Sequence, residues 1–171
     1  LSADDPTIEL HNFDAFTASV LQLRPQSTGE ILLKSSNIRD YPAIHPNYLS
    51  DPSDQRTIVE GIRIARRICR QSPIAEMIQS EHAPGPDCKD DDYQSLLNWA
   101  RETSTTIYHP TGTCKMGQDP MAVVDENLNV RGIKKLRVVD CSIMPQIVSG
   151  NTNGPAIMIG EKAADMIIKS K

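Results

Sequence analysis

The sequence has few aromatic residues and lacks the runs and clusters that mark several large classes of protein. Phe, Trp and Tyr make up only 4% of the 171 residues, and hydrophobic residues 39%, so any core is thin for this length. No run of about eighteen apolar residues is present, and we therefore expect no transmembrane segment. The net charge of −4 is spread without a basic cluster, which argues against a nucleic-acid partner.

The cysteines and the N-terminus are equally restrictive. The four cysteines contain no C-x-x-C pair, which argues against a zinc site. Cys69 and Cys88 could form a disulfide in a secreted protein, and free thiols are the alternative. The first residues include neither an initiator Met nor an apolar signal segment, so localisation is unknown from the sequence. We expect a chain that starts at Leu1 to be part of a longer polypeptide.

Apolar periodicity and turn residues predict a mixture of short strands and longer helices. The expected elements are a short strand and a helix over 1–22, strands over 30–35 and 43–49, a helix over 51–71, a helix opening at 90–92, a buried strand over 133–140 and a last helix from about Pro155. The two segments over 30–35 and 43–49 could lie antiparallel.

Two helix faces carry distinctive residues. The helix over 51–71 presents four arginines on one side, at positions 63, 66, 67 and 70. We interpret this row as a solvated face beside acidic neighbours rather than a site for phosphate. The last helix carries small residues on one stripe, which predicts close packing on that side: Ala156, Gly160, Ala163, Ala164 and Ile167.

Two stretches have the composition of an active site. The first is YHPTGTCKMG at 108–117, where His109 precedes a proline and is therefore expected on stiff, extended backbone. The second begins with VDCSIMP at 139–145 and continues into SGNTNGP at 149–155. It predicts a strand ending in Asp140, a turn and a helix N-terminus, which is a place for an electron-rich ligand group. His45 also precedes a proline but lacks the small neighbours, and we interpret it as structural.

These stretches closely resemble the C-terminal signature of the glucose–methanol–choline (GMC) family of flavin-dependent alcohol oxidoreductases. The resemblance covers HPTGTCKMG at 109–117, LRVVDCSIMP at 136–145, SGNTNGP at 149–155 and IGEKAAD at 159–165. LRPQSTG at 23–29 and PNYL at 46–49 are similar to the insect glucose dehydrogenase branch. The resemblance therefore extends over nearly the whole chain.

The resemblance implies roles for two residues in catalysis. His109 matches the family histidine that faces the flavin and takes the hydroxyl proton of the alcohol as hydride leaves its carbon, a role that suits an imidazole. Asn151 holds the position of its partner, where an amide can orient the substrate oxygen. The alternative for Asn151 is a turn residue whose side chain caps the following helix, and the two roles are compatible.

The same resemblance implies FAD as the cofactor. Asp140 and Cys141 match positions that touch its ribityl and pyrophosphate portion. Asn153, Gly154 and Pro155 match the start of the helix whose positive N-terminus points at the pyrimidine edge of the flavin. The chain lacks the G-x-G-x-x-G fingerprint that binds the dinucleotide phosphates in the family. We therefore expect the FAD site to be incomplete in this chain.

The expected fold class is α+β: an antiparallel sheet with flanking helices, as in the GMC substrate domain, followed by a strand, turn and helix that complete the FAD-binding domain. The corresponding parts are 1–107 (substrate-binding domain), 108–135 (histidine turn and connecting strands) and 136–171. The implied partners are an alcohol or sugar substrate and the N-terminal FAD-binding part of the same enzyme. Secretion is plausible by family analogy. The alternatives are a non-catalytic binding domain and, from the residues alone, a metal site made of His109, Cys114 and Cys141.

Overall fold

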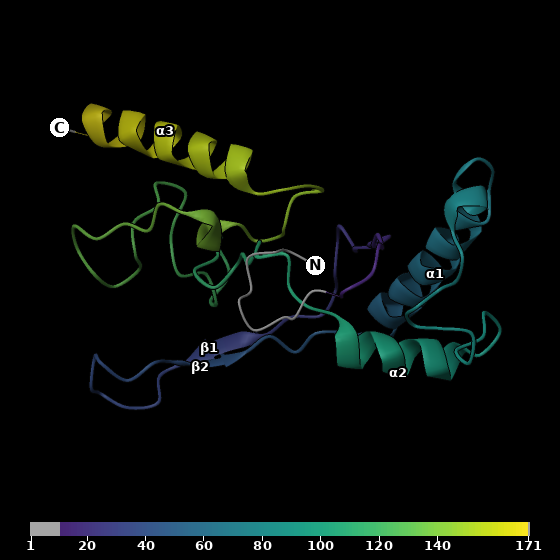
Figure 1. The fold of residues 1–171 in the computed structure, drawn as a ribbon. Coiled ribbons are helices and arrows are strands. Elements are labelled where there is room, and N and C mark those ends of the chain that lie inside the picture. The colour runs from purple at the N-terminus through teal and green to yellow at the C-terminus, as the bar shows by residue number, and fades with distance from the viewer. Residues whose placement is uncertain (1–10, 171) are drawn as a thin grey trace. The chain divides into compact units, whose positions relative to one another are not determined.

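The computed structural model describes residues 11–170, which divide into two compact units. The described part of the first unit comprises 11–21 and 56–102, and that of the second comprises 22–55 and 103–170. The elements, in chain order, are β1 (Glu30–Leu32), β2 (Ala43–His45), α1 (Pro52–Cys69), the 3-10 turn η1 (Ile74–Met77), α2 (Tyr93–Thr103), the 3-10 turn η2 (Cys141–Ile143) and α3 (Asn153–Lys169) (Figure 1).

Helix α1 begins directly after a capping residue, Asp51. The Asp51 carboxylate accepts a hydrogen bond from the Ser53 amide at 2.7 Å, which satisfies one of the free donors at the helix start. Further along, Val59 and Ile62 are buried. Within the first unit, the segment around Val20 packs on this helix: the Val20 side chain lies 3.2 Å from the point where a Cβ on Gly61 would stand. The prediction of a helix over 51–71 is therefore confirmed.

Helix α2 is also capped by an acidic residue. Asp92 accepts hydrogen bonds from the amide and the hydroxyl of Ser95 at 3.0 and 2.6 Å. The buried side of this helix consists of Leu96, Leu97 and Ala100, which recur at helical spacing. Each of the two helices of the first unit therefore buries one apolar face.

Arg66 is the exception to the predicted solvated face of α1. Only 8% of this side chain is exposed. Its Nε donates to Glu81 at 2.8 Å, its Nη1 to Asp90 at 2.7 Å and its Nη2 to the Gly85 carbonyl at 3.3 Å. The prediction of a solvated side chain was wrong for this residue, because its acidic partners come from the loop before α2. These carboxylates compensate the charge of the buried guanidinium, whose burial without them would be unfavourable.

The second unit begins with a hairpin. Strands β1 and β2 pair antiparallel, with Ile31 opposite Ile44 and Glu30 opposite His45. Gly29 directly precedes β1, and a Cβ there would overlap the His45 carbonyl oxygen. The expected antiparallel pairing is confirmed, but in the described residues the sheet has only these two strands of three residues.

The core of the second unit lies beneath α3. Ile159 and Ala163 of this helix pack with Ile143 and Met144 of the η2 region and with Val124 and Leu128. The backbone between 116 and 138 is joined by isolated bridges rather than by a sheet. The α+β class is therefore confirmed in a small form, with two strands and three α-helices among residues 11–170.

Three expectations about these elements were wrong. Residues 133–140 form a turn and one isolated bridge, between Asn129 and Arg137, instead of a buried strand. Their backbone pairs with one neighbouring segment only: the Val130 amide donates to the Leu136 carbonyl, and the Val138 amide donates to the Leu128 carbonyl. Two such hydrogen bonds do not make the continuous pairing of a buried strand. Over 1–22, residues 11–22 contain neither the strand nor the helix, and 1–10 lie outside the described residues.

The third wrong expectation concerns the face that α3 buries. Gly160, Ala164 and Ile167 of the predicted stripe are exposed, and Ile159 is buried instead. The reason is size: the larger Ile159 fills the core above η2, so the helix is turned toward it.

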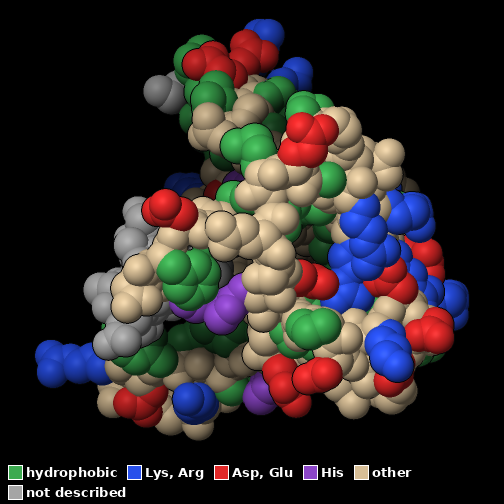
Figure 2. Space-filling model, turned by 45° about the vertical axis from the view of Figure 1, so that its right-hand side comes forward, with side chains coloured by type: hydrophobic (Ala, Val, Ile, Leu, Met, Phe, Trp, Pro, Cys, Tyr) green, Lys and Arg blue, Asp and Glu red, His purple; other side chains and the backbone are tan. Residues whose placement is uncertain are grey.

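No helix in the described part of the chain is long and apolar enough to cross a membrane. Figure 2 shows basic and acidic side chains interspersed on one face of the surface, with apolar side chains between them.

Candidate functional site

The histidine turn is held against η2 by its backbone. The Cys114 amide donates to the Ser142 carbonyl at 3.0 Å, and the Met116 amide to the Ile143 carbonyl at 2.7 Å. The turn itself requires Gly112, which has φ +86° and whose Cβ would stand 3.3 Å from the Met144 oxygen. These contacts lie just beyond His109, which is outside any helix, as the following proline predicts.

The side chain of His109 meets the start of α3. Its Nδ1 lies 2.9 Å from the Thr152 hydroxyl, although the two residues are 43 positions apart. The His109 ring is half-buried, whereas Thr152 is 8% exposed. The structure therefore brings the histidine turn and the helix N-terminus together, and it does so through a residue to which the sequence analysis gave no role.

The start of α3 offers unpaired donors. Among the described residues, the amides of Asn153 and Gly154 have no acceptor, and Pro155 has no N–H to satisfy. A Cβ on Gly154 would meet no atom within 4 Å, so the space beside this helix end is open. Two free amides and the positive end of the helix suit an electron-rich group.

Asn151 precedes Thr152 and is exposed. Within residues 11–170 its side chain makes no hydrogen bond, neither to His109 nor to the helix. The alternative role of a helix cap is therefore not observed, and the amide is free to bind a ligand.

Asp140 and Cys141 lie at the start of η2. The exposed Asp140 carboxylate accepts from the Ser142 amide through Oδ1 at 2.7 Å, which fixes the turn and leaves Oδ2 available. The half-buried Cys141 thiol donates to the Thr152 carbonyl at 3.8 Å. Thr152 thus links the cysteine, the histidine and the helix.

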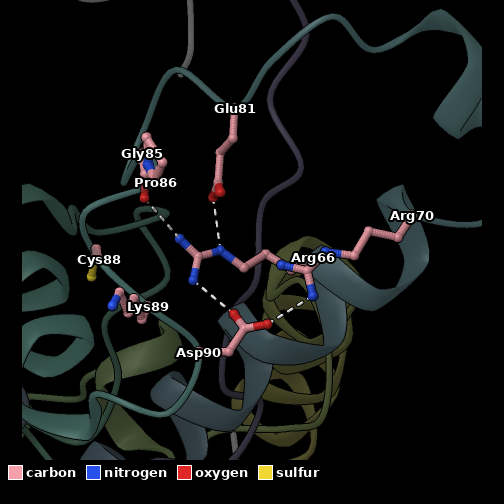
Figure 3. A pocket seen from close by; sticks show the side chains of 8 residues that line it. All are labelled: Arg66, Arg70, Glu81, Gly85, Pro86, Cys88, Lys89 and Asp90. Atoms are coloured by element: carbon pink, nitrogen blue, oxygen red, sulfur yellow. Dashed lines mark hydrogen bonds and ion pairs between the residues drawn. The ribbon is translucent and has the colours of Figure 1, made fainter.

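A hollow lies in the first unit, beside α1. It has a volume of about 210 Å³, and its lining includes Arg66, Arg70, Glu81, Cys88 and Asp90. Figure 3 shows the Arg66 guanidinium pointing between Glu81 and Asp90, with Arg70 reaching the same Asp90. Each of the three guanidinium nitrogens of Arg66 donates one bond, to Glu81, Asp90 or Gly85, so residues of the protein rather than a ligand fix the position of this side chain.

The pKa values around this hollow follow from the same contacts. Burial opposes the charge of Arg66, but the hydrogen bonds to Glu81 and Asp90 outweigh it and raise its pKa. Hydrogen bonds from Arg66 and Arg70 lower the pKa of Asp90. Burial raises the pKa of the Cys88 thiol.

All four cysteines are free thiols, so the disulfide between Cys69 and Cys88 is absent. In the part of the chain that the structure describes, no three His, Cys, Asp or Glu residues are placed to hold a metal ion. The metal site considered for His109, Cys114 and Cys141 therefore has no support.

Comparisons with known proteins identify the class of protein that has this site. Residues 25–160 match the C-terminal domain of the family described as GMC oxidoreductase. The chain is 49% identical over 154 residues to an alcohol dehydrogenase [acceptor] of Pseudomonas putida, a match covering 90% of the chain and 28% of the relative. It is 44% identical over 156 residues to the mitochondrial choline dehydrogenase of Mus musculus, covering 90% of the chain and 26% of the relative.

Comparison with solved structures leads to the same family. The chain superposes on pyridoxine 4-oxidase from Mesorbium loti with a TM-score of 0.77 and 30% identity, over 84% of this chain and 28% of that one. It superposes on formate oxidase of Aspergillus oryzae, whose FAD modification has been studied, with a TM-score of 0.79 and 31% identity. This match covers 86% of this chain and 26% of that one. The chain belongs to the GMC oxidoreductase family of flavoproteins. It spans little more than a quarter of the length of the curated relatives it matches.

The residues present fit FAD, the cofactor expected in this family. The open space at Gly154 and the two free amides beside it accept an electron-rich ring edge, and Asp140 Oδ2 is an exposed acceptor for a hydroxyl.

Proposed function

We propose that this chain is the C-terminal catalytic part of an FAD-dependent oxidoreductase that oxidises the CH–OH group of a primary alcohol or sugar. The observation that supports this most is the contact between His109 and the start of α3, because an imidazole beside a helix end with free amides suits a base that works next to a flavin. The names of the curated relatives, an alcohol dehydrogenase and a choline dehydrogenase, support an alcohol.

Within this proposal each residue of the chain has a separate task. FAD, when bound, supplies the acceptor for the hydride. His109 takes the hydroxyl proton of the substrate through Nε2, since Nδ1 already contacts Thr152. The free amide of Asn151 donates to the substrate oxygen as negative charge develops there. The amides of Asn153 and Gly154 favour electron density on the pyrimidine edge of the ring.

The remaining assignments belong to the same proposal. Asp140 and Cys141 bind the ribityl and pyrophosphate portion, and Asn153, Gly154 and Pro155 the pyrimidine edge. Residues 1–107 belong to the substrate-binding domain, 108–135 carry the histidine turn and 136–171 complete the FAD-binding domain. A sugar substrate, as in the insect glucose dehydrogenase branch, is supported by the motifs over 23–29 and 46–49. The chain alone is inactive, since it carries no G-x-G-x-x-G phosphate cradle.

The test uses the full-length, FAD-loaded enzyme and measures anaerobic bleaching of the flavin by a panel of glucose, choline and simple primary alcohols. His109→Ala should slow flavin reduction by on the order of 10²-fold or more. His45→Ala is the matched control, because it removes an exposed histidine that also precedes a proline. An unchanged rate in His109→Ala would move the general base elsewhere. Reduction by choline alone would exclude the sugar specificity.

The incompleteness of the chain has its own test. The 171-residue chain is mixed with FAD, and the flavin spectrum and stoichiometry are measured. We expect no tight uptake, and stoichiometric binding would contradict the proposal.

A further inference from the structure

Thr152 occupies a position where threonine usually caps a helix, yet its hydroxyl does not do so. It directly precedes α3, with φ −87° and ψ 0°, and its side chain makes no hydrogen bond to the helix amides. The hydroxyl oxygen instead lies 2.9 Å from His109 Nδ1. The contact with the imidazole is therefore the interaction of this hydroxyl that has to be explained.

The backbone of Thr152 is fixed from two directions. Its carbonyl accepts from the Ala156 amide at 2.9 Å, the first bond of α3, and from the Cys141 thiol at 3.8 Å. The residue is 8% exposed, so its hydroxyl has little access to water. A buried hydroxyl on a fixed backbone can hold a partner side chain in one orientation.

We propose that Thr152 is a positioning residue that holds the neutral imidazole of His109 in the tautomer protonated at Nδ1. The inference rests on the proposed function for its consequence in catalysis, but the tautomer is a property of this chain alone. With Nδ1–H donating to the Thr152 oxygen, the lone pair of the ring lies on Nε2. That is the nitrogen with no partner among the described residues, on a ring that is half-exposed.

The contact serves the histidine before and after it takes a proton. A hydroxyl oxygen has two lone pairs and accepts from Nδ1–H in the neutral ring and in the imidazolium alike. Proton transfer to Nε2 then requires no rotation of the ring and no exchange of partners. The opposite arrangement, with the Thr152 hydroxyl donating to Nδ1, would leave the proton on Nε2 and the base occupied.

The experiment compares Thr152→Val, which has nearly the same shape but no hydroxyl, with Thr152→Ser, which keeps the hydroxyl. Thr105→Val is the matched control, because Thr105 is exposed and lies just outside the histidine turn. The protein is the full-length, FAD-loaded enzyme with ¹⁵N-labelled histidine. Two-bond ¹H–¹⁵N spectra report the protonated ring nitrogen, and His109→Gln identifies the signals of His109.

We expect the wild type and Thr152→Ser to show His109 protonated at Nδ1, and Thr152→Val to show a mixture or the Nε2 form. Flavin reduction should fall by about 5- to 30-fold in Thr152→Val with substrate affinity nearly unchanged, and should recover largely in Thr152→Ser. Thr105→Val should match the wild type in both measurements.

A wild-type His109 protonated at Nε2 would overturn the inference without any variant, so the test does not depend on Thr152→Val folding. An unchanged tautomer in Thr152→Val would overturn it as well. If His109→Ala keeps its activity, the proposed function fails while the tautomer measurement stands. If His109→Ala is inactive and Thr152 does not affect the tautomer, only the present inference fails.

Discussion

Replacement of Asp54 by alanine is expected to destabilise the protein more than any other single loss of a carboxylate in the second unit that the structure describes. Asp54 is in the first turn of α1 and is 1% exposed. It accepts hydrogen bonds from Gln22 Nε2 at 2.7 Å, from the Gln26 amide at 2.9 Å and from the Ser27 amide at 2.7 Å, and a further bond from the Ser27 hydroxyl. The carboxylate thus ties the segment before the hairpin to the helix.

The magnitude follows from these bonds. A hydrogen bond to a charged group contributes about 1.5–3 kcal/mol, so four would give about 6–12 kcal/mol. In Asp54→Ala water replaces some of these hydrogen bonds, because Gln26 is exposed and Gln22 and Ser27 are half-buried. We therefore expect a loss of about 3–5 kcal/mol in the free energy of unfolding, and a smaller loss of about 1–2 kcal/mol in Asp54→Asn, which keeps the shape and one acceptor.

Urea denaturation of the full-length protein, followed by circular dichroism, measures this difference. Asp40→Ala is the matched control, because the Asp40 carboxylate also accepts bonds, from Ser35 and Asn37, but is exposed. It should cost less than about 1 kcal/mol. A loss in Asp54→Ala no larger than in Asp40→Ala would refute the reasoning.

The pH dependence gives a second check on Asp54. Burial alone would raise the pKa of this carboxyl, but the hydrogen bonds from Ser27, Gln26 and Gln22 outweigh it, and the pKa is lowered in the folded state. Because the folded pKa is the lower one, the stabilisation is fully present above the unfolded pKa of about 3.9 and is lost as the pH falls through the folded pKa. The wild type should therefore lose stability more steeply below about pH 4 than Asp54→Asn does.

Three further outcomes are expected. Arg66→Ala should lower the free energy of unfolding by about 1.5–3 kcal/mol, because it removes a buried guanidinium and its hydrogen bonds to the half-exposed carboxylates of Glu81 and Asp90, whereas Arg70→Ala, at the exposed end of the same cluster, should cost less than about 1 kcal/mol in the same urea assay. Gly29→Ala should destabilise by about 1–3 kcal/mol, because its Cβ would overlap the His45 carbonyl, and equal thermal melts would contradict this. Cys88 should react more slowly with a thiol reagent at pH 8 in the folded protein than in urea, because burial raises its pKa.

The elements that the sequence predicted well are those whose determinants lie close together in the chain. Asp51 caps α1, Asp92 caps α2 and Pro155 lies in the first turn of α3. In each case the signal and the element are within a few residues of each other, so local chemistry decides the outcome. The antiparallel pairing of β1 and β2 was predictable for the same reason, since only ten residues separate the strands.

The features that the sequence did not reveal depend on partners far along the chain. Arg66 is buried because Glu81 and Asp90 lie 15 and 24 positions away, and helical periodicity cannot show that. Residues 133–140 have the composition of a strand but find a backbone partner on one side only. The contact between Thr152 and His109 spans 43 positions, and its only signal in the sequence is a hydroxyl residue directly before the last helix.

The scaffold and the candidate site use polar groups in opposite ways. Asp54 and Arg66 are buried and have every bonding atom occupied, and in the described residues no buried side-chain N or O lacks a partner. At the site, by contrast, the Asn151 amide and Asp140 Oδ2 are unpaired and exposed. A buried polar group without a partner costs stability, whereas an exposed one is solvated by water that a ligand can displace. At the candidate site the free hydrogen-bonding groups are therefore those that the proposed flavin and alcohol would use, and Thr152 is the point at which the fixed scaffold contacts His109, the proposed base.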